Sequence, residues 1–153
     1  MSGKIVGVIS DTHGLMRPEA LDALRGSDLI IHAGDVGKPE VLDELRAIAP
    51  VFAVRGNVDT ASWAAQLPAT LIVAVERIRV YVIHNLGELE IDPVSEGFRI
   101  VVSGHSHQSR IEEKFEVIYL NPGSAGPKRF RLPISVAKVS VRDGRIDVRL
   151  ITL

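Results

Sequence analysis

The sequence predicts an α/β domain in which two packed β-sheets carry helices on their outer surfaces. In the first 60 residues, short apolar runs alternate with helical segments, an order typical of a parallel sheet with right-handed crossovers. From residue 70 onward the pattern is mostly that of β-strands. So many strands in a chain of 153 residues favour two sheets over one. The length fits a single domain over residues 1–153.

The first half supplies three strands and two helices. Pro18 stands at the start of one apolar helical pattern and Gly26 follows its end, as helix boundaries commonly require. The strands are short runs rich in Val, Ile and Leu, which is typical of strands buried on both faces. The expected strands are residues 4–10, 28–32 and 51–54, and the expected helices are residues 18–25 and 39–48.

The second half is expected to form hairpins and one further buried strand. Asp143-Gly144 between two alternating runs is a strong signal for a tight hairpin turn. Glu76-Arg77 separates another such pair. The expected strands are residues 70–75, 78–83, 98–103, 110–114, 116–120, 134–141 and 145–152.

Composition and charge narrow the class of protein. The net charge is −1 and Lys and Arg form no run, which argues against a dedicated nucleic-acid or membrane-surface binder. The absence of cysteine excludes disulfides and thiolate metal sites. Residues 1–10 lack the pattern of a signal peptide and no apolar stretch is long enough to span a bilayer, so we expect a cytoplasmic protein.

Polar residues cluster directly after the expected strands. Because the carboxyl ends of parallel strands line one edge of a sheet, side chains in these positions should converge. Glycine precedes Asp35, Asn57 and His105, and allows sharp turns or close approach there. The converging side chains are expected to be Asp11, His13, Asp35, Asn57, His84, His105 and His107.

This set of four imidazoles, two carboxylates and one amide suits a transition metal and not calcium. Seven ligands exceed the needs of one four-coordinate ion, and they suit two ions bridged by a carboxylate. Each cluster alone has a simpler interpretation: a helix cap at Asp11, a turn at Gly34-Asp35 or Gly56-Asn57, a core histidine at His84. Their conjunction favours the metal centre. His32, inside the second strand, is expected to be structural or to support a metal ligand.

These motifs, in this order, resemble those of the calcineurin-like metallophosphoesterase superfamily, and within it the small single-domain YfcE-like phosphodiesterases. The resemblance runs from Ser10-Asp11-Thr12-His13 to Gly104-His105-Ser106-His107 and on to Asn121-Pro122-Gly123-Ser124. It implies a four-layer αββα sandwich of two mixed sheets. It also implies one metal on Asp11, His13, Asp35 and His107, and another on Asp35, Asn57, His84 and His105, with Asp35 as the bridge.

The expected reaction is hydrolysis of a phosphodiester in a small substrate by a hydroxide held between two divalent metals. We expect manganese, with iron, nickel or zinc as alternatives. His84 and Asn57 are expected beside the reacting phosphate, and Asp59 is expected to orient Asn57 or a metal ligand.

Two positions depart from the family pattern. Many members carry histidine after the Gly-Asn pair, where it assists the leaving group, and here that position is Val58. Its absence should hurt poor leaving groups most and favours diesters over monoesters. The fourth motif often contains a second histidine, but here His84 is followed by Asn85 and Leu86.

Other functions remain open at this point. The retromer sorting subunit resembles this fold and serves as an interaction scaffold, so a non-enzymatic scaffold is one alternative. A phosphomonoesterase or a dinucleoside-polyphosphate hydrolase is another. Relatives of this type suggest a homodimer or homotetramer.

Overall fold

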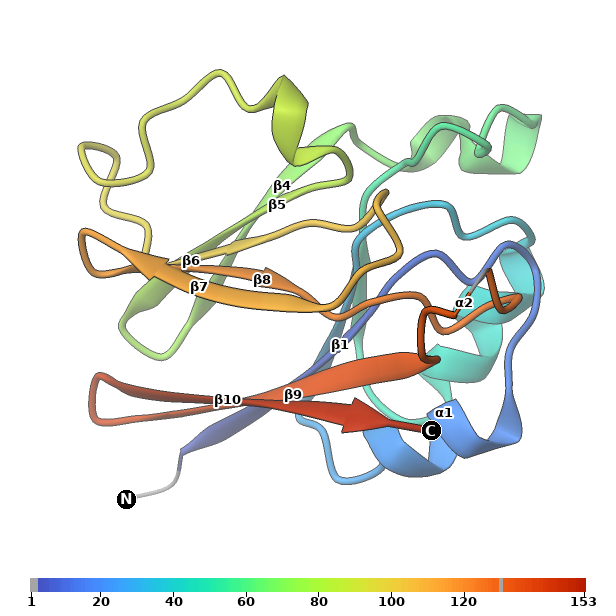
Figure 1. Cartoon of the computed structure of the whole chain (residues 1–153), viewed down its shortest axis with the longest axis horizontal. Helices are drawn as coiled ribbons and strands as arrows, with labels where there is room; N and C mark the ends of the chain where they lie inside the picture. The colour runs from blue at the N-terminus through green and yellow to red at the C-terminus, as the bar shows by residue number, and fades with distance from the viewer. Residues whose placement is uncertain (1–2, 130) are drawn as a thin grey trace.

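The computed structural model describes residues 3–129 and 131–153, and within them two five-stranded sheets pack together (Figure 1). The first half of the chain holds β1 (Lys4–Ile9), α1 (Pro18–Leu24), β2 (Leu29–His32), α2 (Pro39–Arg46), β3 (Val51–Ala53) and the short 3₁₀ helix η1 (Ser62–Gln66). The second half holds β4 (Thr70–Val75), β5 (Ile78–Ile83), the 3₁₀ helix η2 (Leu86–Glu88), β6 (Ile100–Val102), β7 (Arg110–Lys114), β8 (Val117–Asn121), β9 (Ser135–Arg142) and β10 (Arg145–Thr152).

Both sheets are mixed. In the first, with the order β10-β9-β1-β2-β3, the strands β1, β2 and β3 run parallel and the C-terminal hairpin adds two antiparallel strands. In the second, with the order β4-β5-β6-β8-β7, the strands β5, β6 and β8 run parallel. The predicted sandwich of two mixed sheets is therefore confirmed.

The core lies between the sheets. Val6, Val8 and Ile31 of the first sheet pack against residues such as Val80 and Val102 of the second. Burying an aliphatic side chain of this size contributes roughly 1.5–3 kcal/mol, so this layer is the main stabilising contact between the two sheets.

The outer faces are covered unequally. Helices α1 and α2 cover the first sheet through a second apolar cluster that includes Leu24 and Leu45. Their apolar residues recur at helical spacing, which gives each helix one buried face. Within residues 3–129 and 131–153, the second sheet is covered by η2 and its flanking loop, where Leu86, Leu89 and Ile91 pack on Tyr81. The fourth layer of the sandwich is therefore thin.

Several expected boundaries differ from the structure. The strand expected at residues 98–103 spans only Ile100–Val102, because Phe98 precedes the ladder and packs under the loop that covers the second sheet. The helices η1 and η2 were not expected, since a single 3₁₀ turn is too short to leave a periodic pattern. Among the described residues, the helices fall short of the length and apolar character needed to cross a membrane.

Strand direction places the candidate site. The carboxyl ends of β1, β2, β5 and β6 open at the same edge of the sandwich, where ligands of parallel sheets usually bind (Figure 1). Pairing continues past the strand ends: Asp11 N donates to Gly34 O at 3.0 Å, and Gly104 N donates to His84 O at 2.9 Å. These bonds hold each loop of the site against the loop that follows the neighbouring strand.

Candidate metal centre

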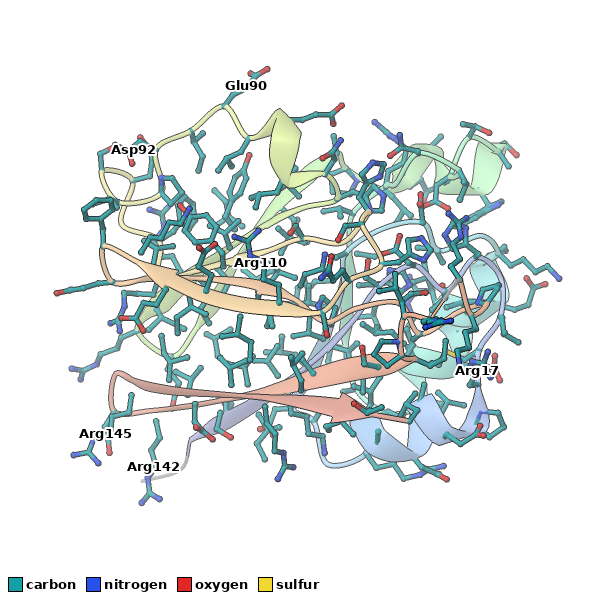
Figure 2. All side chains as sticks on the ribbon, viewed as in Figure 1. Arg17, Glu90, Asp92, Arg110, Arg142 and Arg145 are labelled. Carbon is teal, nitrogen blue, oxygen red and sulfur yellow. The ribbon has the colours of Figure 1, made fainter. Side chains whose placement is uncertain are left out.

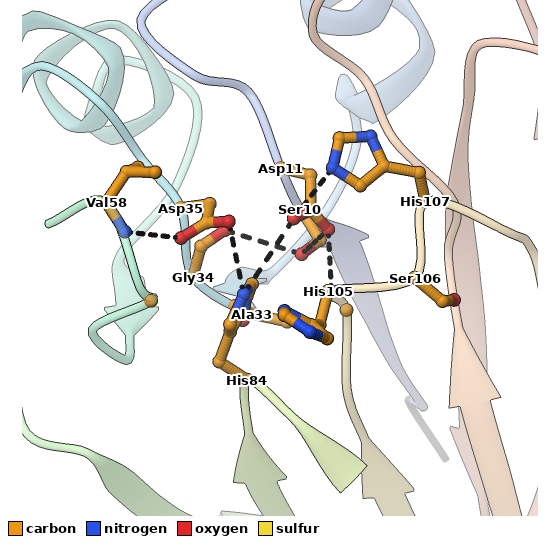
Figure 3. A network of polar contacts seen from close by, with 12 residues as sticks. Ser10, Asp11, Ala33, Gly34, Asp35, Val58, His84, His105, Ser106 and His107 are labelled. Carbon is orange, nitrogen blue, oxygen red and sulfur yellow. Dashed lines mark hydrogen bonds and ion pairs between the residues drawn. The ribbon is translucent and has the colours of Figure 1, made fainter. Parts of the chain in front are cut away.

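The two carboxylates of the site are each tied to the protein by one oxygen and leave the other free (Figure 3). Asp11 Oδ2 accepts from Ser10 Oγ at 2.7 Å and from His105 N at 3.1 Å. Asp35 Oδ1 accepts from Val58 N at 3.0 Å. The other oxygen of each carboxylate faces imidazole nitrogens, so both carboxylates are oriented before any ligand arrives.

Three imidazoles surround the free oxygens. His84 Nε2 lies 3.2 Å from Asp35 Oδ2 and 4.0 Å from Asp11 Oδ1. His13 Nε2 lies 3.7 Å from Asp35 Oδ2 and 3.9 Å from Asp11 Oδ1. His107 Nε2 lies 3.5 Å from Asp11 Oδ1 and 3.3 Å from His13 Nε2. The side chains come from both sheets and form two overlapping groups that share Asp11: Asp11, His13 and His107, and Asp11, Asp35 and His84.

The tautomer of His84 follows from its second ring nitrogen. Nδ1 lies 2.8 Å from Ala33 O, a carbonyl that can only accept, so Nδ1 carries the proton and donates it. When the ring is neutral, the Nε2 lone pair therefore points at the carboxylate oxygens. A histidine held in this way by a backbone carbonyl is typical of metal-binding histidines.

These donors fit a divalent cation. Within the described residues, Asp11 Oδ1 and His84 Nε2 are buried without a hydrogen-bond partner. Buried polar atoms are costly when unpaired, and lone pairs that face one another repel. A cation between the carboxylates and imidazoles would satisfy both atoms, and the mixed nitrogen and oxygen donors suit manganese, iron, nickel or zinc.

Electrostatics differ between the two carboxylates. Burial raises the pKa of Asp11 above its ordinary value. Burial also acts to raise the pKa of Asp35, but the adjacent His84 ring, the Val58 N–H and nearby histidine charges outweigh it, so the pKa falls well below its ordinary value. Asp35 is therefore ionised, as a carboxylate that binds cations must be.

Five of the predicted site residues hold left-handed backbone. Their φ values lie between 48° and 71°, a region that L-residues other than Asn and Asp rarely adopt. Non-glycine residues in this conformation cost about 1–3 kcal/mol each and concentrate at functional sites. The five residues are Asp11, His13, Asp35, His105 and His107.

Asn57 and His105 lie at the border of the site. Asn57 is exposed in the loop after β3 and lines the same cleft as His84. His105 is also exposed, with its ring edge-on to the His84 ring at a centroid distance of 5.2 Å. The structure thus brings five of the seven predicted ligands into two overlapping groups, and places His105 beside His84 and Asn57 on the same cleft.

Asp59 holds loops together through hydrogen bonds to backbone N–H groups. Its buried carboxylate accepts from Gly56 N at 2.9 Å, from Gly37 N at 2.9 Å and from Val36 N at 3.0 Å. It thereby ties the residues just after Asp35 to the residue just before Asn57. Asp59 thus positions the loops that carry Asp35 and Asn57 through their main chain.

Glycines allow the loops to approach this closely. A Cβ at Gly56 would lie 2.1 Å from Asp35 N and 2.2 Å from Asp35 Oδ1. A Cβ at Gly104 would lie 2.0 Å from Ser10 Oγ and 2.6 Å from Asp11 Oδ2. Real Cβ atoms do not approach other atoms to such distances. Each glycine therefore packs directly against one of the two carboxylates.

Supporting residues around the site carried only a weak signal in the sequence. Ser124 Oγ donates to Asp11 O at 3.0 Å, and Asn121 Nδ2 donates to Gly104 O at 3.0 Å. Both belong to the segment Asn121-Pro122-Gly123-Ser124, which took part in the family resemblance but had no expected role. His32 is fully buried, accepts from Gly34 N through Nδ1 and contacts Thr12 Oγ1 through Nε2, in agreement with a structural role.

Comparisons with known proteins agree with this geometry. Residues 5–144 match the model of the Calcineurin-like phosphoesterase superfamily domain. A protein of Methanothermobacter thermautotrophicus named "probable metallophosphoesterase" is 36% identical, over 96% of this chain and 91% of its own length.

Solved structures share the fold. A predicted phosphoesterase of Streptococcus pneumoniae superposes with a TM-score of 0.78 at 25% identity, covering 99% of this chain and 91% of that one. A structure described as a novel archaeal phosphodiesterase gives 0.83 at 21% identity, covering 97% and 99%. Vacuolar Protein Sorting 29 of Cryptosporidium parvum gives 0.77 at 22% identity, covering 99% and 98%.

The family match spans nearly the whole chain, and the same chain folds its Asp and His motifs into two overlapping groups able to hold a metal. The protein belongs to the calcineurin-like phosphoesterase superfamily.

Proposed function

We propose that this protein is a phosphodiesterase that uses two divalent metal ions, with manganese as the first choice. The observation that carries the proposal is the pair of overlapping Asp and His groups, in which Asp11 Oδ1 and His84 Nε2 are buried without a partner among the described residues. Membership of the superfamily supports hydrolysis of a phosphoric ester.

In this proposal one ion is held by Asp11, His13, Asp35 and His107, and the other by Asp35, Asn57, His84 and His105. The two groups share Asp11, but Asp35 Oδ2 lies nearer to both histidines, at 3.7 Å from His13 Nε2 and 3.2 Å from His84 Nε2, than Asp11 Oδ1 does at 3.9 Å and 4.0 Å. These shorter distances support Asp35 as the bridge. When bound, such ions lower the pKa of a coordinated water and neutralise charge on the phosphoryl oxygens.

The residues of the chain supply orientation around that chemistry. Ser10 and the His105 N–H hold Asp11, and the Val58 N–H holds Asp35, so the two carboxylates keep a fixed direction during the reaction. The Asn57 amide and the His84 ring both line the cleft of about 780 Å³ that opens beside the centre. A phosphoryl group entering there would meet both side chains.

Position 58 supports a diester substrate. Its backbone N–H holds Asp35, but its side chain is valine, which is 49% exposed and cannot give a proton to a leaving oxygen. General-acid help of this kind is worth roughly 100- to 10,000-fold. Substrates with a good leaving group should suffer least from its absence. The structural likeness to a protein described as a phosphodiesterase is in line with this choice.

The test uses metal-free protein to which Mn²⁺, Fe²⁺, Ni²⁺ or Zn²⁺ is returned. We expect Mn²⁺ to restore hydrolysis of bis(p-nitrophenyl) phosphate, with slower turnover of p-nitrophenyl phosphate. Asp35→Asn should lower kcat/KM at least 1,000-fold, since the bridge and the charge are both lost. Asp147→Asn, on an exposed part of β10, is the matched control and should keep full activity.

A non-enzymatic scaffold is the second candidate, because the fold also superposes on Vacuolar Protein Sorting 29. It would be favoured if the protein bound metal, as measured by titration calorimetry, yet hydrolysed neither ester with any of the four ions. Faster turnover of the monoester than of the diester would instead favour a phosphomonoesterase.

A further inference from the structure

Within the described chain each sheet has two edge strands, and three of these four edges are protected against pairing with another strand. An edge strand presents N–H and C=O groups that have no partner in its own sheet. β3 has only three residues, and β4 lies against β3 where Arg55 N donates to Pro68 O at 2.8 Å. β7 carries Glu113 on the face it shares with Ile118, so a charge points to the core side of the sheet. Short strands, covered edges and inward charges all discourage association through an edge.

β10, on the open side of the first sheet, is a long edge strand without such protection in the part of the chain that the structure describes (Figure 1). All eight of its residues pair with β9 in a single register, without a bulge to bend the strand. It contains neither Pro nor Lys. Figure 2 shows the Arg142 and Arg145 side chains at the end of this hairpin, directed away from the rest of the molecule. β10 is therefore the edge most open to another strand.

Every second residue of β10 has free backbone groups. In an antiparallel ladder, alternate residues bond to a given neighbouring strand. Leu153 N donates to Ile134 O at 2.8 Å at the end of this ladder, so the odd-numbered residues of β10 bond to β9. The backbone groups of the even-numbered residues point away from β9. Among residues 3–129 and 131–153, the N–H and C=O groups of Ile146, Val148 and Leu150 have no hydrogen-bond partner.

The charges of β10 make the strand complementary to itself. Its exposed face carries charges of alternating sign. When a second copy runs antiparallel about Val148, Asp147 lies opposite Arg149 of the other copy, and symmetry forms this ion pair twice. A register centred on Asp147 would place Arg145 opposite Arg149, and one centred on Arg149 would place that residue opposite itself. Registers centred further along would leave part of the strand unpaired, so the charges select pairing about Val148.

The inner face of β10 favours the same register. Ile146 would lie opposite Leu150 of the second copy, and Val148 opposite Val148. These aliphatic side chains pack against the core but are only half-buried in the single chain. A paired strand would cover more of their surface, which is favourable.

We propose that two copies of this chain form a symmetric dimer in which their β10 strands pair antiparallel about Val148 and join the two first sheets into one. The even-numbered residues supply the main-chain hydrogen bonds, as in other proteins that add a strand to a sheet edge. Within each copy, Asp147 pairs with Ser140 and Ser140 with Ile5 at the amino end of β1, whereas the candidate centre lies beyond the carboxyl end of β1. The dimer therefore leaves the centre open, and the inference does not depend on the proposed activity.

Sedimentation velocity over a range of protein concentrations measures the association. Because the pairing of one strand buries little surface, we expect a dissociation constant of about 1–100 µM. The mass should rise from 16.6 kDa to twice that value across this range. Asp147→Asn keeps an oxygen that accepts from Arg149 of the second copy and adds no repulsion, so it should weaken the dimer by at most about fivefold.

Charge reversal tests the register. Asp147→Arg places like charges opposite each other twice and should raise the dissociation constant about 10- to 100-fold. Adding Arg149→Asp to that variant restores opposite charges and should return the constant to within about threefold of the parent value. Glu44→Arg makes the same change of charge on an exposed position of α2 and should leave the association unchanged.

Single cysteines provide a second measurement, since the chain contains none of its own. Val148→Cys places two thiols on the dimer axis, where the Cα atoms of a hydrogen-bonded pair are about 5.5 Å apart and within reach of a disulfide. Mild oxidation should therefore link two copies of this variant. Ile146→Cys lies on the same face of the strand, but its two thiols would be about 14 Å apart and should not form the link.

A parent protein that stays monomeric at the highest concentration would overturn the inference. A dimer that survives Asp147→Arg, or that links through Ile146→Cys as readily as through Val148→Cys, would also overturn it, because another surface or register would then hold the copies together. Circular dichroism checks that each variant is folded. If Asp147→Arg did not fold, the two cysteine variants would still decide the register.

Discussion

At the scale of single residues, the candidate centre was the most predictable part of the molecule. Aspartate and histidine directly after apolar strands are few in this sequence, and the direction of parallel strands predicts that they meet. Which oxygen of Asp35 would face His84 could not be predicted, because it depends on the N–H of Val58 from another loop. The left-handed backbone of the candidate ligands could not be predicted either, since histidine and aspartate carry no strong signal for it.

His105 allows the cost of that backbone conformation to be measured. Its φ is 71° and its side chain is exposed, so substitutions there change backbone preference more than packing. In metal-free protein, His105→Gly should be more stable than His105→Ala by about 1 kcal/mol, because glycine adopts this conformation without a Cβ clash. Urea unfolding of the two variants gives the difference.

Ser106 supplies the control for this pair. It is exposed and lies outside the positive-φ positions of the described residues, so there the glycine variant should be the less stable of the two. Equal stability of the glycine and alanine variants at His105 would contradict the assigned strain.

His32 predicts a specific loss of stability in acid. Burial lowers the pKa of His32 to about 4, below its ordinary value of 6.5, so the folded protein keeps it neutral. The unfolded chain takes up a proton below pH 6.5, and the folded protein does so only near pH 4. Stability from this group is therefore complete above pH 6.5 and falls by about 3 kcal/mol as the pH drops to about 4.

The measurement compares His32→Gln with the parent protein by urea unfolding between pH 4 and 7.5 in the presence of EDTA. Gln cannot titrate, so the stability advantage of the parent should shrink by about 3 kcal/mol across this range. Parallel curves for the two proteins would mean that His32 already titrates in the folded state near its ordinary pKa.

At the scale of elements, the bounds of the hairpins and helices could be predicted closely from the sequence. The neighbour of each strand within its sheet could not. Strands β4, β5, β7 and β10 have the expected bounds, because alternation and turn residues are local signals. The addition of β9 to the free side of β1 could not be predicted, since alternation identifies the buried face of a strand and not its neighbour. The loops of the site are likewise joined by contacts between residues distant in sequence.

Asp59 is the main link between two of these loops, and its replacement should loosen both. Asp59→Asn removes the negative charge that strengthens the hydrogen bonds from Val36 N, Gly37 N and Gly56 N. It also leaves one accepting oxygen in place of two and turns an NH₂ group toward a backbone N–H. We expect unfolding free energy to fall by about 2–3 kcal/mol. Titration calorimetry should also find weaker Mn²⁺ binding, because the loops that carry Asp35 and Asn57 lose their common anchor.

Asp92→Asn is a matched control. Asp92 also accepts a backbone N–H, that of Val94, but it does so on an exposed loop away from the carboxylates of the site. Its replacement should change unfolding free energy by less than about 0.5 kcal/mol. If both variants unfolded at the same urea concentration, the anchoring role of Asp59 would be wrong.

At the scale of the whole molecule, the candidate centre joins the two sheets. Asp11, His13 and Asp35 follow strands of the first sheet, whereas His84, His105 and His107 follow strands of the second. Elsewhere the sheets meet mainly through aliphatic side chains, and the hydrophobic effect that holds these together has no preferred direction. The polar edge of the sandwich is therefore where a bound cation would fix the position of one sheet against the other.

Metal binding should stabilise the folded protein for this reason. With free Mn²⁺ at 100 times the dissociation constant, one site adds about 2.7 kcal/mol, which corresponds to roughly 5–10 °C in Tm for a chain of this size. EDTA should reverse the shift. His84→Ala removes one of the proposed ligands from the second sheet, so its Tm should rise less with Mn²⁺ although both sheets remain intact. Asp147→Asn should respond like the parent protein. A Tm that Mn²⁺ leaves unchanged in the parent would mean that no ion bridges the sheets at this edge, and an equal rise in His84→Ala would mean that His84 does not hold one.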